Sequence, residues 1–194
     1  FHNAMENKDW RAEEIVVGAG SKILIFCVMA ALRGAEVLLP RPSWVSYQPQ
    51  AGLAGHKVSW VDTRLEDRWR LTPDRLEEFC SSRTNATGPL LLVFNYPGNP
   101  TGQTYSREQL RELAEVMRKH EILVIADEIY EKLVYDGMRH VSVAGFSDEA
   151  YARLNTYLRS GGMIVFDTRD ADVSRFGGTA SPASRRLQQI ARPL

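Results

Sequence analysis

Hydrophobic and polar positions follow a repeating pattern from the start of the chain to about residue 145. Short apolar runs end at polar or turn residues, and longer segments with helical periodicity separate them. Strands are therefore predicted at four places: Glu36–Leu39, Lys57–Val61, Leu90–Phe94 and Ile122–Ala126. Leu90–Phe94 is apolar throughout, which is typical of a strand buried on both faces of a parallel sheet. Strand–helix–strand units of this size favour right-handed crossovers, so the pattern predicts an α/β fold.

The segments between the predicted strands have the signals of helices. Residues 20–33 are apolar nearly all round, as in a buried helix, and a second helix is expected near Trp44–Leu53. Two further helices have start signals, namely Thr72 before Pro73, and a capping box of Ser106 and Gln109. The helix that starts at the capping box should end near His120.

Composition narrows the functional classes. The formal net charge of +0 gives no electrostatic argument for nucleic acid or an anionic membrane as a partner. The chain has no apolar run near the roughly 20 residues that span a bilayer. It begins with Phe1 and shows no export signal, so it resembles an excerpt of a longer product, with the cytoplasm as the default location.

Cys27 and Cys80 are expected to be buried free thiols, and the four histidines share no metal-ligand spacing.

Polar and aromatic residues follow the predicted strands, where ligands bind in an open α/β sheet. Asn99 lies in the turn after Leu90–Phe94, Asp127 ends the next strand, and Trp44 follows the first strand. Gly18–Ser21 leads into a helix, and free N–H groups at a helix start accept phosphate. Each of these features alone is more often structural, but together they suit an aromatic, phosphorylated ligand.

The combination of motifs resembles the fold-type I, class I/II aminotransferases, which use pyridoxal phosphate. The segments that carry this resemblance are Asn95–Gly102, Ala126–Tyr130, Gly18–Lys22, Pro42–Tyr47 and Ser106–Leu110. Pro-Ser-Trp-Val-Ser-Tyr and Asn-Tyr-Pro-Gly-Asn-Pro-Thr-Gly are most similar to the branch near aspartate-type enzymes. The resemblance extends over Val16–Val143 and implies a three-layer α/β/α sandwich, the large cofactor domain of the family.

The resemblance also implies roles for individual residues. Asp127 would keep the pyridine nitrogen protonated, because a nearby carboxylate favours the charged ring. Asn99 and Tyr130 would bind the phenolic oxygen, and Trp44 would stack on the ring. The residues implied at the phosphate are Gly20, Ser21 and, less firmly, Lys22, for which a solvated helix position is about equally compatible with the sequence.

The family's lysine, which bonds covalently to the cofactor, has no counterpart in this sequence. The chain contains five lysines: Lys8, Lys22, Lys57, Lys119 and Lys132. Lys132 comes too early after Tyr130 to match the family lysine, and Lys22 lies near the phosphate end. We therefore predict no catalytic residue, and expect the chain to be inactive alone.

The chain divides into two predicted parts. Residues 1–146 correspond to a partial large domain, and residues 147–194 depart from the family. The tail is similar to part of a bacterial family of unknown function with an amidotransferase-like α/β fold, which would make it a foreign graft. Alternatively, the chain is a divergent member in which the strand Met163–Phe166 replaces the family's next strand.

The expected reaction is amino-group transfer between an amino acid and a 2-oxo acid with pyridoxal phosphate. Two alternatives remain, a non-catalytic module that binds this cofactor or a partner, and a lyase that uses an unrecognised lysine. The resemblance implies a homodimer, which truncation would put in doubt, and no nucleic acid or membrane partner.

Overall fold

The structure is a computed structural model that describes residues 16–83 and 88–146. Its centre is a parallel sheet of four strands in the order β2-β1-β3-β4. The strands are β1 (Glu36–Arg41), β2 (Lys57–Asp62), β3 (Leu90–Asn95) and β4 (Leu123–Asp127). Because all four strands run the same way, the loops that leave their carboxyl ends gather at one edge of the sheet.

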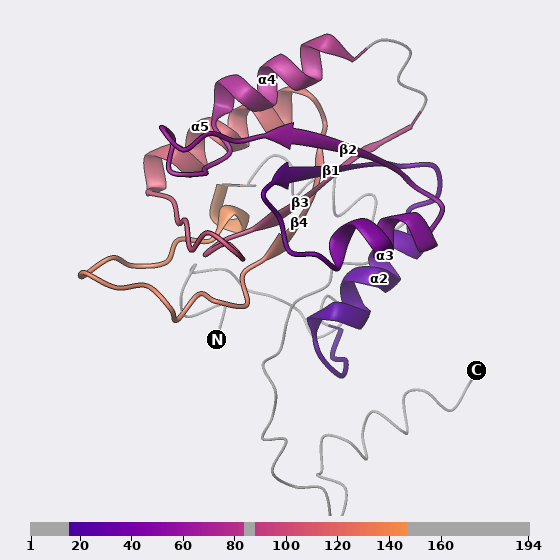
Figure 1. Ribbon diagram of the computed structural model, residues 1–194, viewed down its shortest axis with the longest axis horizontal. Coiled ribbons are helices and arrows are strands. Elements are labelled where there is room, and N and C mark those ends of the chain that lie inside the picture. Colours follow the sequence, from indigo (N-terminus) through magenta and orange to yellow (C-terminus); the bar gives the residue numbers. More distant parts are fainter. Residues whose placement is uncertain (1–15, 84–87, 147–194) are drawn as a thin grey trace, which may run out of the picture.

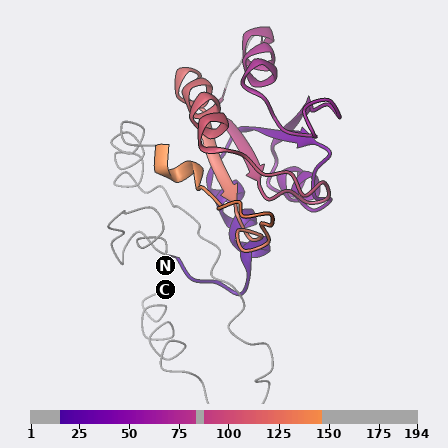
Figure 2. The same ribbon diagram turned by 90° about the vertical axis from the view of Figure 1, so that its left-hand side faces the viewer.

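Helices cover both faces of this sheet. The elements are α2 (Ser21–Ala31), α3 (Tyr47–Leu53), α4 (Pro73–Ser82), α5 (Arg107–Lys119) and the 3-10 helix η2 (Val143–Phe146). Figure 1 shows α4 and α5 on one side of the sheet and α2 and α3 on the other. The turned view in Figure 2 keeps α2 and α4 on opposite sides. The predicted three-layer α/β/α sandwich is confirmed.

Each face of the sheet has its own hydrophobic core. Leu38, Leu92 and Phe94 pack beneath α4 and α5 with Leu76, Leu110 and Leu113 of those helices. The neighbouring strand residues Val37, Leu39 and Leu91 point the other way, against Ile25, Met29 and Ala51 of α2 and α3. This alternation is the period of two of a strand, and it explains why the strands read as continuous apolar runs.

The predicted helix starts at Thr72 and Ser106 are confirmed. The Thr72 side chain accepts a hydrogen bond from the N–H of Arg75, and Ser106 and Gln109 form the reciprocal capping box. Leu110, Leu113 and Met117 of α5 are buried, as its apolar stripe predicts.

Three expectations need correction. Strand β1 does not end at Leu39, before Pro40, but continues to Arg41. Beyond Leu38 this strand pairs with β2 alone, so one of its edges is unpaired there. A proline, which has no N–H to donate, is tolerated at such an edge. Helix α3 begins at Tyr47, which leaves Trp44 in the preceding turn. Cys80 is buried as predicted, but Cys27 is exposed.

The exposure of Cys27 follows from how α2 packs. Leu24, Ile25, Val28 and Met29 are the buried residues of α2, so one side of the helix faces the sheet while the apolar Ile23 is 49% exposed. An apolar sequence all round the helix therefore does not indicate a helix that is buried all round.

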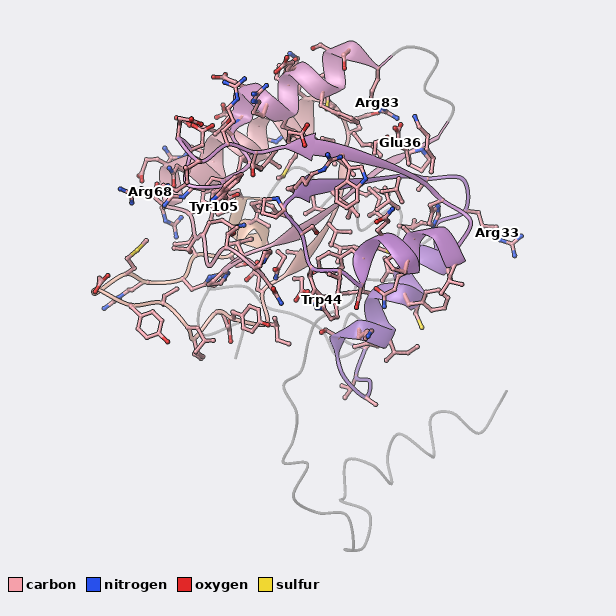
Figure 3. All side chains as sticks on the ribbon, viewed as in Figure 1. Arg33, Glu36, Trp44, Arg68, Arg83 and Tyr105 are labelled. Atoms are coloured by element: carbon pink, nitrogen blue, oxygen red, sulfur yellow. The ribbon has the colours of Figure 1, made fainter. Side chains whose placement is uncertain are left out.

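The amino end of the sheet contains a partly buried ion cluster, which we call the Glu36 cluster: Glu36, Lys57, Ser59 and Arg83. Arg83 donates two hydrogen bonds of 3.0 and 2.8 Å to Glu36 Oε2, and Lys57 Nζ lies 2.8 Å from Oε1. Burial alone would raise the pKa of Glu36, but the bonds from Lys57, Ser59 and Arg83 lower it to about 2. Figure 3 shows Glu36 and Arg83 at the end of the sheet away from Trp44.

The expected helix Ser147–Ser160, the strand Met163–Phe166 and the division at residue 147 lie outside the described residues. They stay predictions.

Candidate functional site

The predicted site residues lie at the carboxyl end of β4, in the loops that follow strands, or at the start of α2. Trp44 lies between β1 and α3, Asn99 follows β3, Asp127 ends β4, and Tyr130 lies in the turn after β4. The remaining three, Gly20, Ser21 and Lys22, are at the start of α2.

The start of α2 presents free N–H groups. Its cap residue, Gly20, has a φ of 100°, a conformation that side chains rarely adopt, and no side chain to accept from the first turn. A β-carbon placed on Gly20 would meet nothing within 4 Å, so the glycine serves the backbone conformation rather than close packing. The first turn contains no acidic residue. An anion is the group that such a helix end attracts.

Asp127 is the central polar group of the site. It is 6% exposed, and its Oδ2 accepts a 2.5 Å hydrogen bond from the hydroxyl of Tyr47 in α3. Its Oδ1 lies 3.4 Å from the N–H of Ile129, a weak contact that begins the turn after β4. Burial raises the pKa of Asp127, and the nearby charge of Glu128 adds to this, while the bonds from Tyr47 and Ile129 oppose it. The site therefore contains a buried carboxyl group that would gain from a cationic partner.

Tyr47 connects Asp127 with Trp44, and Trp44 in turn contacts Lys22. Burial, followed by the charges of Asp127 and Tyr130, raises the pKa of the Tyr47 phenol, so it remains a proton donor. The Tyr47 ring packs edge-on against Trp44, with centroids 5.2 Å apart and planes at 80°. Lys22 Nζ in turn lies 5.4 Å from the centroid of the Trp44 ring, a cation–π contact.

Gln50 fixes the start of α2 relative to α3. It lies one helical turn after Tyr47, is 8% exposed, and donates a 2.7 Å hydrogen bond to the backbone carbonyl of Lys22. The first turn of α2 and the Tyr47 phenol are thus held by the same short helix.

Asn95 joins the turn after β3 to the end of β4. Its Nδ2 donates to the Asp127 carbonyl at 2.8 Å, and its Oδ1 accepts from the N–H of Asn99 at 2.8 Å. The N–H of Tyr96 also donates to the Asp127 carbonyl, at 3.2 Å. These bonds place the backbone of Asn99 beside the strand end that carries Asp127.

The fold therefore places Trp44, Asp127 and Tyr130 around Tyr47, with Lys22 over the Trp44 ring. It also ties the Asn99 backbone to the strand end that carries Asp127. Sequence reasoning missed Tyr47, Gln50 and Asn95 as site residues. Tyr47 and Asn95 belong to segments that carry the family resemblance, yet a tyrosine or glutamine in a helix is more often part of the core. Nothing in the sequence indicates that Tyr47 contacts Asp127, because 80 positions separate the two.

The described residues show neither a metal centre nor a membrane-spanning helix. Residues 16–83 and 88–146 contain no group of three or more histidine, cysteine, aspartate or glutamate side chains placed to hold a metal ion. Within the same ranges, none of the helices has the length and apolar character needed to cross a bilayer.

Comparison with known proteins identifies the family. The family model described as aminotransferase class I and II matches residues 1–165. That match runs past residue 147, where the sequence pattern changes. The position of a boundary there stays a prediction.

Individual relatives agree with the family model. The chain is 38% identical over 147 residues to the aspartate aminotransferase of Geobacillus stearothermophilus, covering 75% of this chain and 36% of that protein. It is 40% identical over 147 residues to the probable aspartate/prephenate aminotransferase of Aquifex aeolicus, again covering 36% of the relative. The chain thus spans about a third of the length of these relatives.

Solved structures show the same relationship. The aspartate aminotransferase of Rhizobium meliloti has a TM-score of 0.67 and 30% identity, covering 74% of this chain and 36% of that structure. The Thermus thermophilus aspartate aminotransferase with maleate has a TM-score of 0.62 and 36% identity, covering 71% and 35%. The chain therefore belongs to the class I and II aminotransferases.

Proposed function

We propose that this chain binds pyridoxal phosphate at the carboxyl edge of its sheet, as the cofactor-holding part of an aminotransferase. The observation that carries the proposal is Asp127, a carboxyl group that is 6% exposed, whose pKa burial raises, and that forms no ion pair with a cationic side chain among the described residues. The protonated ring nitrogen of pyridoxal phosphate would supply that cation. The group fits the site because a free helix start at Gly20 and an aromatic ring at Trp44 are nearby.

The chain's own residues have distinct tasks in this proposal. Asp127 holds a proton on the ring nitrogen, and Tyr47 orients the Asp127 carboxylate through its hydrogen bond. Trp44 provides a flat apolar surface for stacking. The N–H groups at the start of α2, together with Ser21 and Lys22, bind the phosphate.

Asn99 and Tyr130 complete the ring contacts by binding its phenolic oxygen. The position of the Asn99 backbone beside Asp127, and of the Tyr130 phenol near Tyr47, supports these assignments. When bound, pyridoxal phosphate supplies an electron-withdrawing ring that stabilises negative charge on the α-carbon of an amino acid.

The reaction of the whole protein is then the exchange of an amino group between an amino acid and a 2-oxo acid. The relatives' names, aspartate aminotransferase and probable aspartate/prephenate aminotransferase, support an amino-acid substrate of this kind. A homodimer and a cytoplasmic location remain predictions.

Titration of the purified chain with pyridoxal phosphate tests the proposal. We expect saturable binding of one cofactor per chain, with quenching of tryptophan fluorescence because Trp44 stacks on the ring. Asp127→Ala should abolish most of this binding. Lys119→Met, on the far layer of the sandwich, is the control and should bind as wild type does. Absence of saturable binding to the folded wild-type chain would contradict the proposal.

Reduction with borohydride separates the remaining alternatives. The sequence has no lysine after Lys132, and the side chain of Lys132 is half exposed near Glu131. We therefore expect binding without a lysine-specific adduct in peptide mass maps. An adduct on one lysine, accompanied by turnover, would instead support an enzyme that uses that lysine, such as a lyase.

A further inference from the structure

A second buried carboxylate lies next to Asp127 but on the other side of the strand end. Glu128 follows Asp127 directly, and its side chain is 10% exposed. While Asp127 contacts Tyr47 on the α2 and α3 side, Glu128 contacts residues that pack with the α4 and α5 core. Asp127 and Glu128 therefore connect the end of β4 to opposite faces of the sheet.

Three side chains donate to Glu128, and we call these four residues the Glu128 cluster: Tyr96, Glu128, His140 and Ser142. The Tyr96 hydroxyl donates to Oε1 at 2.9 Å, and the Ser142 hydroxyl donates to the same oxygen at 2.8 Å. His140 Nε2 donates to Oε2 at 2.7 Å. The His140 ring also stacks on Tyr96, with centroids 5.2 Å apart. A carboxylate with this many charge-assisted bonds is strongly fixed in position.

The Glu128 cluster is tied to the segment before η2 as well. The N–H of Val143 donates a 2.6 Å hydrogen bond to the Tyr96 hydroxyl, so that hydroxyl accepts one bond and donates another. His140 Nδ1 is buried without a hydrogen-bond partner among the described residues, which places the ring proton on Nε2, facing Glu128. Residues 140–143 thus clamp Glu128 and Tyr96 together.

Each of these two residues directly follows a residue of the candidate site. Tyr96 follows Asn95, which holds the Asn99 backbone, and Glu128 follows Asp127. The hydrogen bond between Tyr96 and Glu128 therefore joins the same two segments as the hydrogen bond between Asn95 and the Asp127 carbonyl, one residue further along each segment.

We propose that the Glu128 cluster is a positioning device, which sets the distance between the Asn99 turn and Asp127 without touching the cofactor. This inference rests on the proposed function for its role in cofactor binding, but the coupling itself is a property of the cofactor-free chain. Disruption of the cluster should loosen both segments at once.

Tyr96→Phe is the sharpest variant, because Tyr105→Phe is a matched control. Both tyrosines are buried in one aromatic group, and each hydroxyl accepts from a backbone N–H, that of Val143 or of Leu71. Only the Tyr96 hydroxyl also bonds Glu128. We expect Y96F to weaken pyridoxal phosphate binding about tenfold, the low end of the effect of losing an outer hydrogen-bond partner of a binding group. Y105F should bind as wild type does.

A second pair of variants removes the charge. Glu128→Gln is matched by Glu36→Gln, since each changes a largely buried carboxylate side chain, 10% and 12% exposed, with three side-chain partners, at opposite ends of the sheet. E128Q should weaken cofactor binding in the folded chain, whereas E36Q should lower stability and leave the affinity unchanged. Equal effects of the two members of either pair on cofactor affinity would overturn the proposal.

Amide hydrogen exchange of the cofactor-free chain tests the positioning role of the Glu128 cluster without relying on cofactor binding. The Asn99 and Ile129 amides, which bond Asn95 and Asp127, should exchange faster in Y96F and E128Q than in their controls. If the wild type binds no pyridoxal phosphate but these amides still accelerate, the proposed function fails and the positioning inference stands. Exchange at the control rates would refute the inference, whatever the wild type binds.

Discussion

The hydroxyl of Tyr47 lies 2.5 Å from Oδ2 of Asp127, across 80 positions of sequence. This bond joins α3 to the end of β4, and thus the two sides of the proposed ring site. It is the main favourable contact of a carboxyl group whose pKa burial raises. The Tyr47 hydroxyl therefore helps to keep Asp127 ionised in a place that disfavours charge.

Tyr47→Phe should shift the pH dependence of cofactor binding. The Tyr47 bond lowers the pKa of Asp127, so its loss lets that pKa rise further. A protonated Asp127 pairs poorly with a cationic ring, and binding should therefore be lost at a higher pH in Y47F than in wild type as the solution is acidified. Dissociation constants for pyridoxal phosphate across a pH series measure this shift. Tyr105→Phe is the control, and superimposable profiles for Y47F and wild type would contradict the assignment.

Asp127→Asn should stabilise the cofactor-free chain while weakening its cofactor binding. Since the folded pKa of Asp127 is raised above the unfolded value, ionisation costs stability. That cost is absent below the unfolded pKa and is complete above the folded pKa. At pH 7 we expect D127N to raise the free energy of unfolding by about 1 kcal/mol, as is usual when a functional site is relieved of an unfavourable group. Urea unfolding measures this gain.

The same variant should bind pyridoxal phosphate at least about tenfold more weakly, because a charge-assisted bond is lost. A variant that is less stable than wild type without cofactor would show that Asp127 is mainly a structural cap. In that role, Asp127 would act through its weak hydrogen bond from the Ile129 N–H, which begins the turn after β4.

Much of the fold could be predicted because local signals and the buried pattern agree. The capping box at Ser106 and the apolar run at Leu90–Phe94 are both found as predicted, since each depends on neighbours in sequence. The exposed face of α2, which carries Cys27, could not be predicted in this way. Whether an apolar helix face is covered depends on which other elements pack there, and sequence periodicity contains no information about that.

The candidate site was predicted less completely than the fold. Asp127 and Trp44 could be named because strand ends and family motifs mark them. The partners that hold them in place, Tyr47 and Asn95, act through contacts between segments far apart in sequence. Glu128 was not predicted as a site residue, because its hydrogen bonds to Tyr96 and His140 again join segments apart in sequence.

Glu36→Gln should destabilise the chain in a pH-dependent way. Burial opposes ionisation of Glu36, but the bonds from Lys57, Ser59 and Arg83 dominate and lower its pKa from 4.5 to about 2. Its contribution to stability is therefore complete above the unfolded pKa and is lost as the pH falls through the folded value. At pH 7 we expect E36Q to lower the free energy of unfolding by about 2 kcal/mol, as for the loss of hydrogen bonds to a charged group. The gap from wild type should narrow between pH 4.5 and 2, and a constant gap would contradict this account.

Lys22→Met should distinguish two roles for Lys22, which lies in the first turn of α2 and also over the Trp44 ring. If Lys22 binds the phosphate, K22M weakens binding of pyridoxal phosphate about tenfold, since a charge-assisted bond is lost, and leaves binding of pyridoxal unchanged. If it acts by holding Trp44, both ligands lose affinity equally. We expect the first result, because the start of α2 already favours an anion there. Fluorescence titrations with the two ligands make the measurement, with Lys119→Met as the control for loss of one positive charge. Equal losses for the two ligands would assign Lys22 to Trp44 and leave the phosphate to the backbone N–H groups of α2.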